Sequence, residues 1–181
     1  MSPRLALTAV LLAVVAAGTA SSGAQQPPPA PAPYPLDNVP DKMPFDIPYG
    51  APITLERAQA AIAAAAAEAR KHDWKLCIAV VDSGGNLVAF QRMDGAQVAS
   101  VQISEHKARA SAMFRRETKV FETGIQQNGY NYLLTLDGVI GSRGGMPLVE
   151  GGKLVGAIGC SGGTGSQDEV ACKAGVAATA K

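Results

Sequence analysis

The chain has 181 residues, of which 47% are hydrophobic and only 5% aromatic, and its formal net charge is +1. This length and composition exclude a large multidomain enzyme and a collagen-like repeat. The near-zero charge excludes a basic nucleic-acid-binding protein, because such proteins concentrate Lys and Arg on one surface.

Residues 1–24 have the features of a secretory signal peptide. Arg4 precedes an apolar run over 5–17, and small residues continue to Ala24, after which a signal peptidase would cut; Ala20 offers an alternative site. The run is short for a bilayer, so we expect a periplasmic or secreted protein with no membrane span after cleavage. Loss of Arg4 leaves equal numbers of acidic and basic residues.

Residues 25–52 contain ten of the 12 prolines. This density excludes helix interiors and central strands, and it favours extended polyproline structure. We expect either a linker or a strap that lies on a neighbouring protein, and the aromatic residues Tyr34, Phe45 and Tyr49 favour the strap. The remaining range, 53–181, has the length of a single folded domain.

The domain sequence alternates helical and strand patterns. In chain order we expect a helix over 55–71 capped by Thr54, and then strands at 76–81 and 87–92 joined by a turn at 82–86. A helix over 98–115 follows, and a second helical piece is capped by Thr118 and ends near Asn128. Strands at 147–150 and 153–160 are joined by Gly151-Gly152, and a last helix begins at Ser166 with Glu169 in a capping box. Two hairpins among helices predict an α/β (α+β) fold in which helices pack against an antiparallel sheet.

The segment 159–163 matches the nucleophile elbow G-x-S-x-G. His72 and His106 both precede Ser161, whereas the hydrolase order places the catalytic histidine after the serine. A tight strand-to-helix connection explains the glycines better, and neither a P-loop nor a dinucleotide-binding motif is present in the sequence. We identify no catalytic residues.

The sequence contains three cysteines, Cys77, Cys160 and Cys172. A bridge between Cys160 and Cys172 would leave Cys77 reduced in a strand, and three small apolar fillers are an equally good interpretation. The absence of a C-x-x-C-H motif excludes covalently attached c-type haem.

The domain resembles the GlcG/HbpS family, whose members are often described as haem-degrading or haem-binding domains. The matching segments are LERA at 55–58, AVVDSGGNL at 79–87, RMDG at 92–95, HKARASAMF at 106–114, GGMPL at 144–148, GAIGCSGG at 156–163 and QDE at 167–169. The resemblance covers 53–181 in order. It implies a profilin-like antiparallel sheet flanked by helices, assembly into dimers or larger rings, and haem binding in some exported members.

A haem site needs an apolar slot, an axial donor and cations for the propionates. His106 is the candidate iron ligand, and our cofactor-binding set is His106, Lys107, Arg109 and Met113. Further candidates are Arg115 and Arg116 for the propionates, and Met146, Tyr130 and Tyr132 as secondary ligands. The alternative is that His106 is a solvated helix residue. We expect His72 to be exposed.

Together these observations predict an exported protein that binds haem non-covalently, for storage, trafficking, sensing or degradation. We also expect a homo-oligomer. The alternative function is a non-catalytic accessory subunit that binds no haem and docks a periplasmic partner through the Pro-rich segment. A small-molecule enzyme is the third class, but the sequence offers no paired acid and base for it.

Overall fold

The computed structural model describes residue 36 and residues 38–180. Its elements are α1 (Leu55–Lys71), β1 (Cys77–Asp82), β2 (Leu87–Arg92), α2 (Ser100–Phe114), α3 (Lys119–Gln126), the 3-10 helix η2 (Asn131–Thr135), β3 (Gly145–Glu150), β4 (Lys153–Ser161) and α4 (Gly165–Thr179). The expected signal peptide and the first part of the Pro-rich segment lie outside the described residues.

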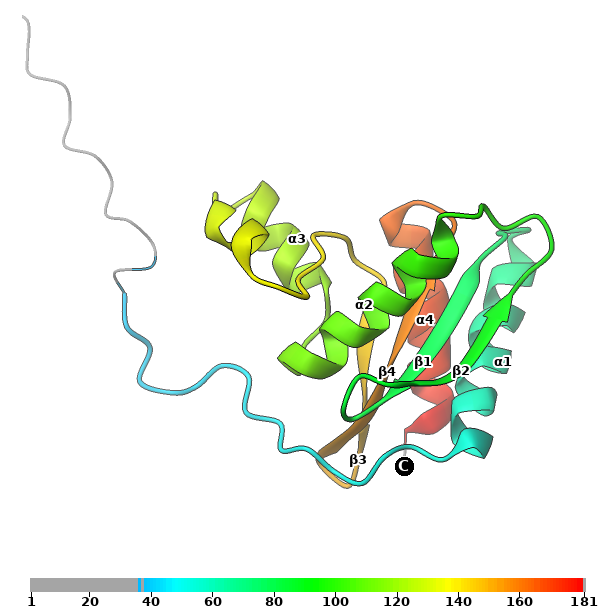
Figure 1. Ribbon diagram of the computed structural model, residues 1–181, viewed down its shortest axis with the longest axis horizontal. Helices are drawn as coiled ribbons and strands as arrows, with labels where there is room; N and C mark the ends of the chain where they lie inside the picture. The colour runs from blue at the N-terminus through cyan, green and yellow to red at the C-terminus, as the bar shows by residue number, and fades with distance from the viewer. Residues whose placement is uncertain (1–35, 37, 181) are drawn as a thin grey trace, which may run out of the picture. The chain divides into compact units, whose positions relative to one another are not determined.

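The four strands form one sheet in the order β2-β1-β4-β3, and each neighbouring pair is antiparallel. Helices α1 and α4 lie side by side on one face of this sheet, and α2 crosses the opposite face (Figure 1). Helix α3 and η2 pack together. The predicted α+β fold with an antiparallel sheet and flanking helices is therefore confirmed.

Helix α1 packs through small residues. Thr54 caps it by accepting a hydrogen bond from the Arg57 amide, at 3.4 Å. Its buried face consists almost entirely of alanines, which keep the helix axis close to its neighbours. On α4, Gly175 faces α1, and an added Cβ would lie 2.9 Å from the Ala61 carbonyl oxygen. These two helices therefore approach each other more closely than larger side chains would permit.

Helix α2 lies directly on the sheet because glycines replace larger residues beneath it. A Cβ on Gly159 of β4 would overlap the Ser104 carbonyl oxygen, and one on Gly145 of β3 would overlap the Lys107 carbonyl oxygen. Gly145 and Gly159 in the glycine-rich sequence after 138 thus permit this close approach of backbones.

The predicted capping box of the last helix is wrong in its residues. Helix α4 begins one residue earlier, and Thr164 with Gln167 forms the box: each side chain accepts a hydrogen bond from the other residue's amide. Glu169 instead pairs with the cations Lys119 and Lys173. The motif repeats itself at a spacing of two residues, and the sequence alone did not distinguish the two registers.

The predicted cap of α3 also differs. Thr118 precedes α3, but its side chain makes no capping hydrogen bond. Its hydroxyl oxygen accepts a hydrogen bond from the Gly145 amide at 3.0 Å instead, which connects the start of α3 to β3. The Thr118 hydroxyl therefore makes a tertiary contact with β3 in place of the helix cap that the local sequence predicted.

The end of the Pro-rich segment, residues 44–53, lies on the chain's own domain, and we call this segment the strap. Pro48 and Gly50 exchange backbone hydrogen bonds with Leu154 at 2.8 and 2.7 Å. The Tyr49 hydroxyl donates to the Met113 carbonyl at 2.8 Å, and Arg115 donates to the Ile47 carbonyl at 3.1 Å. The strap therefore contacts its own domain, and contact of this segment with a neighbouring protein stays a prediction.

Candidate functional site

His106 lies on the face of α2 that points away from the sheet, and its ring is half-buried. Its Nε2 atom is 3.3 Å from the Gly138 carbonyl oxygen. In the neutral tautomer that carries its hydrogen on Nε2, the ring donates to this carbonyl and keeps a lone pair on Nδ1. In that tautomer this hydrogen bond orients the ring without using the Nδ1 lone pair.

The loop at Gly138 lies against two of the candidate residues, His106 and Met113. Gly138 has a φ of 82°, and its Cβ position is 3.9 Å from the Met113 sulfur and 3.8 Å from the Phe114 ring. His106 and Met113 thus contact the same loop from two turns of α2. The groove there has a volume of about 350 Å³ and is lined by Gln102, Glu105, His106, Arg109 and Gly138.

Arg109 supplies the positive charge of this groove. Its side chain is exposed, and its Nε atom donates to the Gly85 carbonyl at 3.3 Å. Among the described residues no carboxylate lies within 4 Å of its guanidinium. The charge one turn from His106 is therefore available to an anionic group such as a carboxylate.

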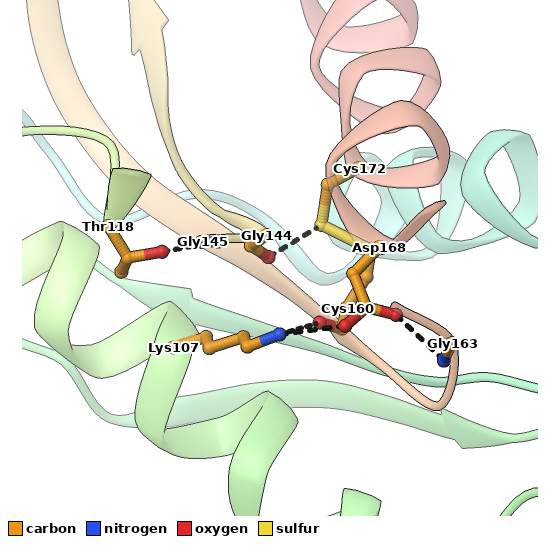
Figure 2. The surroundings of a disulfide bond; sticks show 8 residues. All are labelled: Lys107, Thr118, Gly144, Gly145, Cys160, Gly163, Asp168 and Cys172. Carbon is orange, nitrogen blue, oxygen red and sulfur yellow. Dashed lines mark hydrogen bonds and ion pairs between the residues drawn. A yellow bond between two sulfur atoms is a disulfide. The ribbon is translucent and has the colours of Figure 1, made fainter. Parts of the chain in front are cut away.

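Lys107 does not belong to this groove, contrary to the prediction. Its side chain is 1% exposed, and its ammonium lies 2.8 Å from Asp168 Oδ2 and 3.1 Å from the Cys160 carbonyl oxygen (Figure 2). Consecutive residues on a helix point about 100° apart. Lys107 therefore faces the sheet while His106 faces outward. The charge of Lys107 is paired with that of Asp168.

The buried ion pair lies beside a disulfide. Cys160 on β4 and Cys172 on α4 are bonded (Figure 2), with their Cα atoms 5.8 Å apart. Cys77 is free and buried. Of the two interpretations that the sequence left open, the structure has the bridge. Burial raises the pKa of the Cys77 thiol, with a smaller opposing effect from Arg92. Burial also raises the pKa of Asp168, and Lys107 opposes that effect.

The remaining candidates are dispersed. Met146 is buried in the sheet core, and Arg115 binds the strap. His72 stacks on Trp74 with ring centroids 4.4 Å apart and is exposed, as expected. Arg116, Tyr130 and Tyr132 line a second, larger cavity of about 620 Å³ between the strap, α3 and η2.

Sequence reasoning missed that larger cavity. Its walls include Phe45 of the strap and Phe121 of α3, which belong to segments far apart in the chain. The aromatic residues of the Pro-rich segment were the available signal, but nothing in the sequence indicated which surface they would cover.

The part of the chain that the structure describes contains neither a cluster of metal ligands nor a helix able to span a membrane. No three His, Cys, Asp or Glu side chains there gather as a metal site. Within the same residues, no helix combines the length and the apolar character that crossing a bilayer requires.

Comparison with protein families gives a match to the family described as haem degrading protein HbpS-like, over residues 53–177. The chain belongs to the HbpS-like family. Protein GlcG of Escherichia coli K12 is 42% identical to the chain over 109 residues, which are 60% of this chain and 81% of GlcG. The glycine-rich and α2 segments that suggested the family are thus part of an HbpS-like domain.

Solved structures agree with the HbpS-like assignment. A double mutant of HbpS from Streptomyces reticuli has 30% identity and a TM-score of 0.66, covering 82% of this chain and 97% of that protein. PduOC in complex with heme has the same fold, with 22% identity and a TM-score of 0.64, covering 72% of this chain and 99% of that protein.

Proposed function

We propose that this protein binds haem non-covalently on the outer face of α2, in haem storage, trafficking or sensing. The family is described by haem degradation, and haem binding is the step that degradation also requires. The observation on which the proposal rests is the His106 imidazole, with one nitrogen directed at the Gly138 carbonyl and the other available to iron.

The residues at the groove are of the types that a haem site requires. His106 would be the axial donor, Arg109 would pair with a propionate, and the Met113 side chain would contact the ring from the next turns of α2. Bound haem would supply an iron centre for ligand binding or electron transfer. The protein's own part is to hold the imidazole, place a cation beside it and exclude water from one side.

One copy of the groove encloses only part of a macrocycle, because its volume of about 350 Å³ is near the lower limit for small-molecule pockets. Exposed apolar side chains lie on the 130–138 segment that borders it, and Leu134 is 68% exposed. We propose that a second copy of this chain covers the remaining ring surface. The expected homo-oligomer and the haem site would then depend on each other.

We also propose that the protein is exported, on the sequence of residues 1–24. The Cys160–Cys172 disulfide supports this proposal, because structural disulfides persist in oxidising compartments such as the periplasm. The alternative role, docking a periplasmic partner through all of 25–52, is less well supported, because the strap is occupied by contacts with its own domain.

A spectroscopic titration tests the proposal. Haemin is added to the purified mature protein while the Soret band is recorded, with heat-unfolded protein as the control. We expect a saturable spectral shift that the unfolded chain does not give. A spectrum equal to the sum of free haemin and protein would contradict the proposal.

A further inference from the structure

A cavity larger than the His106 groove lies away from it, beneath the strap. It has a volume of about 620 Å³, within the usual range for small-molecule sites. Pro44 and Phe45 of the strap form one wall, α3 contributes Val120 and Phe121, and Tyr130 and Leu133 close the opposite side. The walls are therefore mainly apolar and rich in flat aromatic rings.

Arg116 lies at this cavity, and its charge is not neutralised by a carboxylate. Its Nε atom donates to the Phe114 carbonyl at 2.8 Å. Its guanidinium carbon is 3.5 Å from the centroid of the Phe45 ring and 5.7 Å from that of Phe121. Among residues 36 and 38–180, no acidic side chain lies within 4 Å of it. Burial, followed by the charge of Arg115, lowers its pKa.

Two other charged side chains line the cavity. Lys119 lies 3.2 Å from a carboxylate oxygen of Glu169. Glu117 helps to raise the pKa of Lys173 after the larger effect of Glu169, and among the described residues no cation lies within 4 Å of its carboxylate. Arg116 is therefore the cation of the cavity whose charge can meet an anion, and its guanidinium is held by aromatic faces that leave its terminal amino groups free to donate.

The strap is fixed over this cavity. Tyr49 and Ile47, which follow Phe45, are bonded to the end of α2 through the Met113 carbonyl and the Arg115 side chain. Phe45 consequently has two roles: it closes the cavity, and it stacks on Arg116 and orients its guanidinium.

We propose that this cavity binds a small aromatic carboxylate, with the aromatic body between Phe45, Phe121 and Tyr130 and the carboxylate on Arg116. The rings favour a flat body, and the guanidinium matches the planar carboxylate with two parallel hydrogen bonds. This site shares no lining residue with the His106 groove, and the proposal does not depend on haem binding.

The test uses the full mature chain and 2-naphthoate as the probe, measured by displacement of the fluorescent anion 1-anilinonaphthalene-8-sulfonate. Arg116→Gln should weaken 2-naphthoate at least tenfold and change the affinity for neutral 2-naphthalenemethanol much less, because a charge-assisted hydrogen bond is lost. Arg116→Lys should recover part of the loss. Phe45→Ala should weaken both compounds. Arg109→Gln is the matched control and should change neither.

Three outcomes would overturn the proposal. The first is an unchanged 2-naphthoate affinity in Arg116→Gln, and the second is an equal loss in Arg109→Gln. The third is displacement of 2-naphthoate by haemin together with a Soret band that responds to Phe45→Ala, because the cavity would then be the haem site. Failure of haemin to bind anywhere would contradict the proposed function and leave the naphthoate result unaffected. Thermal unfolding of each variant shows that it is folded.

Discussion

Lys107 and Asp168 form a buried ion pair between α2 and the first turn of α4. The side chains are 1% and 3% exposed, and Gly163 donates its amide to the second carboxylate oxygen of Asp168 at 3.0 Å. Such pairs connect elements in a defined geometry, but an unpaired member leaves a charge in a medium of low polarity. Lys107 therefore has a structural role.

Removing one member of this pair should strongly destabilise the protein. Lys107→Met leaves the Asp168 carboxyl buried without its cation, and we expect a loss of about 3–5 kcal/mol in the free energy of unfolding. Denaturant titration at neutral pH measures it. Lys173→Met is the matched control, since Lys173 pairs with Glu169 but is exposed, and should cost less than about 1 kcal/mol. Equal effects of the two changes would contradict the assignment.

Glu122 on α3 accepts hydrogen bonds from the Arg143 amide at 2.7 Å and from its Nε at 2.6 Å. Burial raises the pKa of Glu122, but the hydrogen bonds and charge of Arg143 outweigh burial and leave this pKa below its usual value. An acid whose pKa is lowered by folding stabilises the folded state above its unfolded pKa, and this contribution is lost as the pH falls.

We therefore expect wild type to be more stable than Glu122→Gln at pH 7, with a difference that shrinks as the pH falls from about 5 toward 3. Unfolding free energies from denaturant titrations at several pH values measure it. A difference that grows in acid would show that the carboxylate is not the stabilising form.

At the scale of elements, glycines determine the distance between α2 and the sheet. Gly159→Ala would place a methyl group against the Ser104 carbonyl and force the helix outward, and such overpacking costs about 1–3 kcal/mol. Gly84→Ala in the exposed hairpin turn is the control, because its Cβ would lie 3.1 Å or more from its neighbours. Thermal unfolding of the two variants compares them. A Gly159→Ala protein as stable as the control would contradict close packing of α2.

Element types were predictable because hydrophobic periodicity and turn residues are local signals. Both hairpins and the helices of the domain lie where these patterns placed them, to within a few residues. The pairing of β1 with β4 was not predictable, because it joins strands separated by most of the domain. Periodicity contains no information about such partners.

The candidate site was predicted in part. His106, Arg109 and Met113 share a face because they are three or four residues apart on one helix, which the sequence shows. Lys107 was assigned to the wrong face, because the type of residue was weighed above its position on the helix. The Gly138 loop has no periodicity, so its contact with His106 emerged only from the fold.

At the scale of the molecule, the apolar surface around the groove predicts self-association. Met113, Leu134 and Leu136 are exposed. Large exposed apolar side chains are common at interfaces between protein chains. We expect at least a dimer at micromolar concentration, measured by light scattering. Leu134→Glu should shift the mass toward the monomer, whereas Val170→Glu, at an exposed position on α4, should not. A monomeric wild type would contradict the proposed second copy at the site.

The most direct test of haem binding on α2 is a haemin titration of three proteins: wild type, His106→Ala and His72→Ala. The two histidines are the only ones in the chain, and His72 stacks on Trp74 at the end of α1, so it controls for loss of an imidazole. We predict that His106→Ala shifts the Soret band and weakens binding at least tenfold, while His72→Ala matches wild type in both. An unchanged spectrum and affinity in His106→Ala would contradict His106 as the iron ligand.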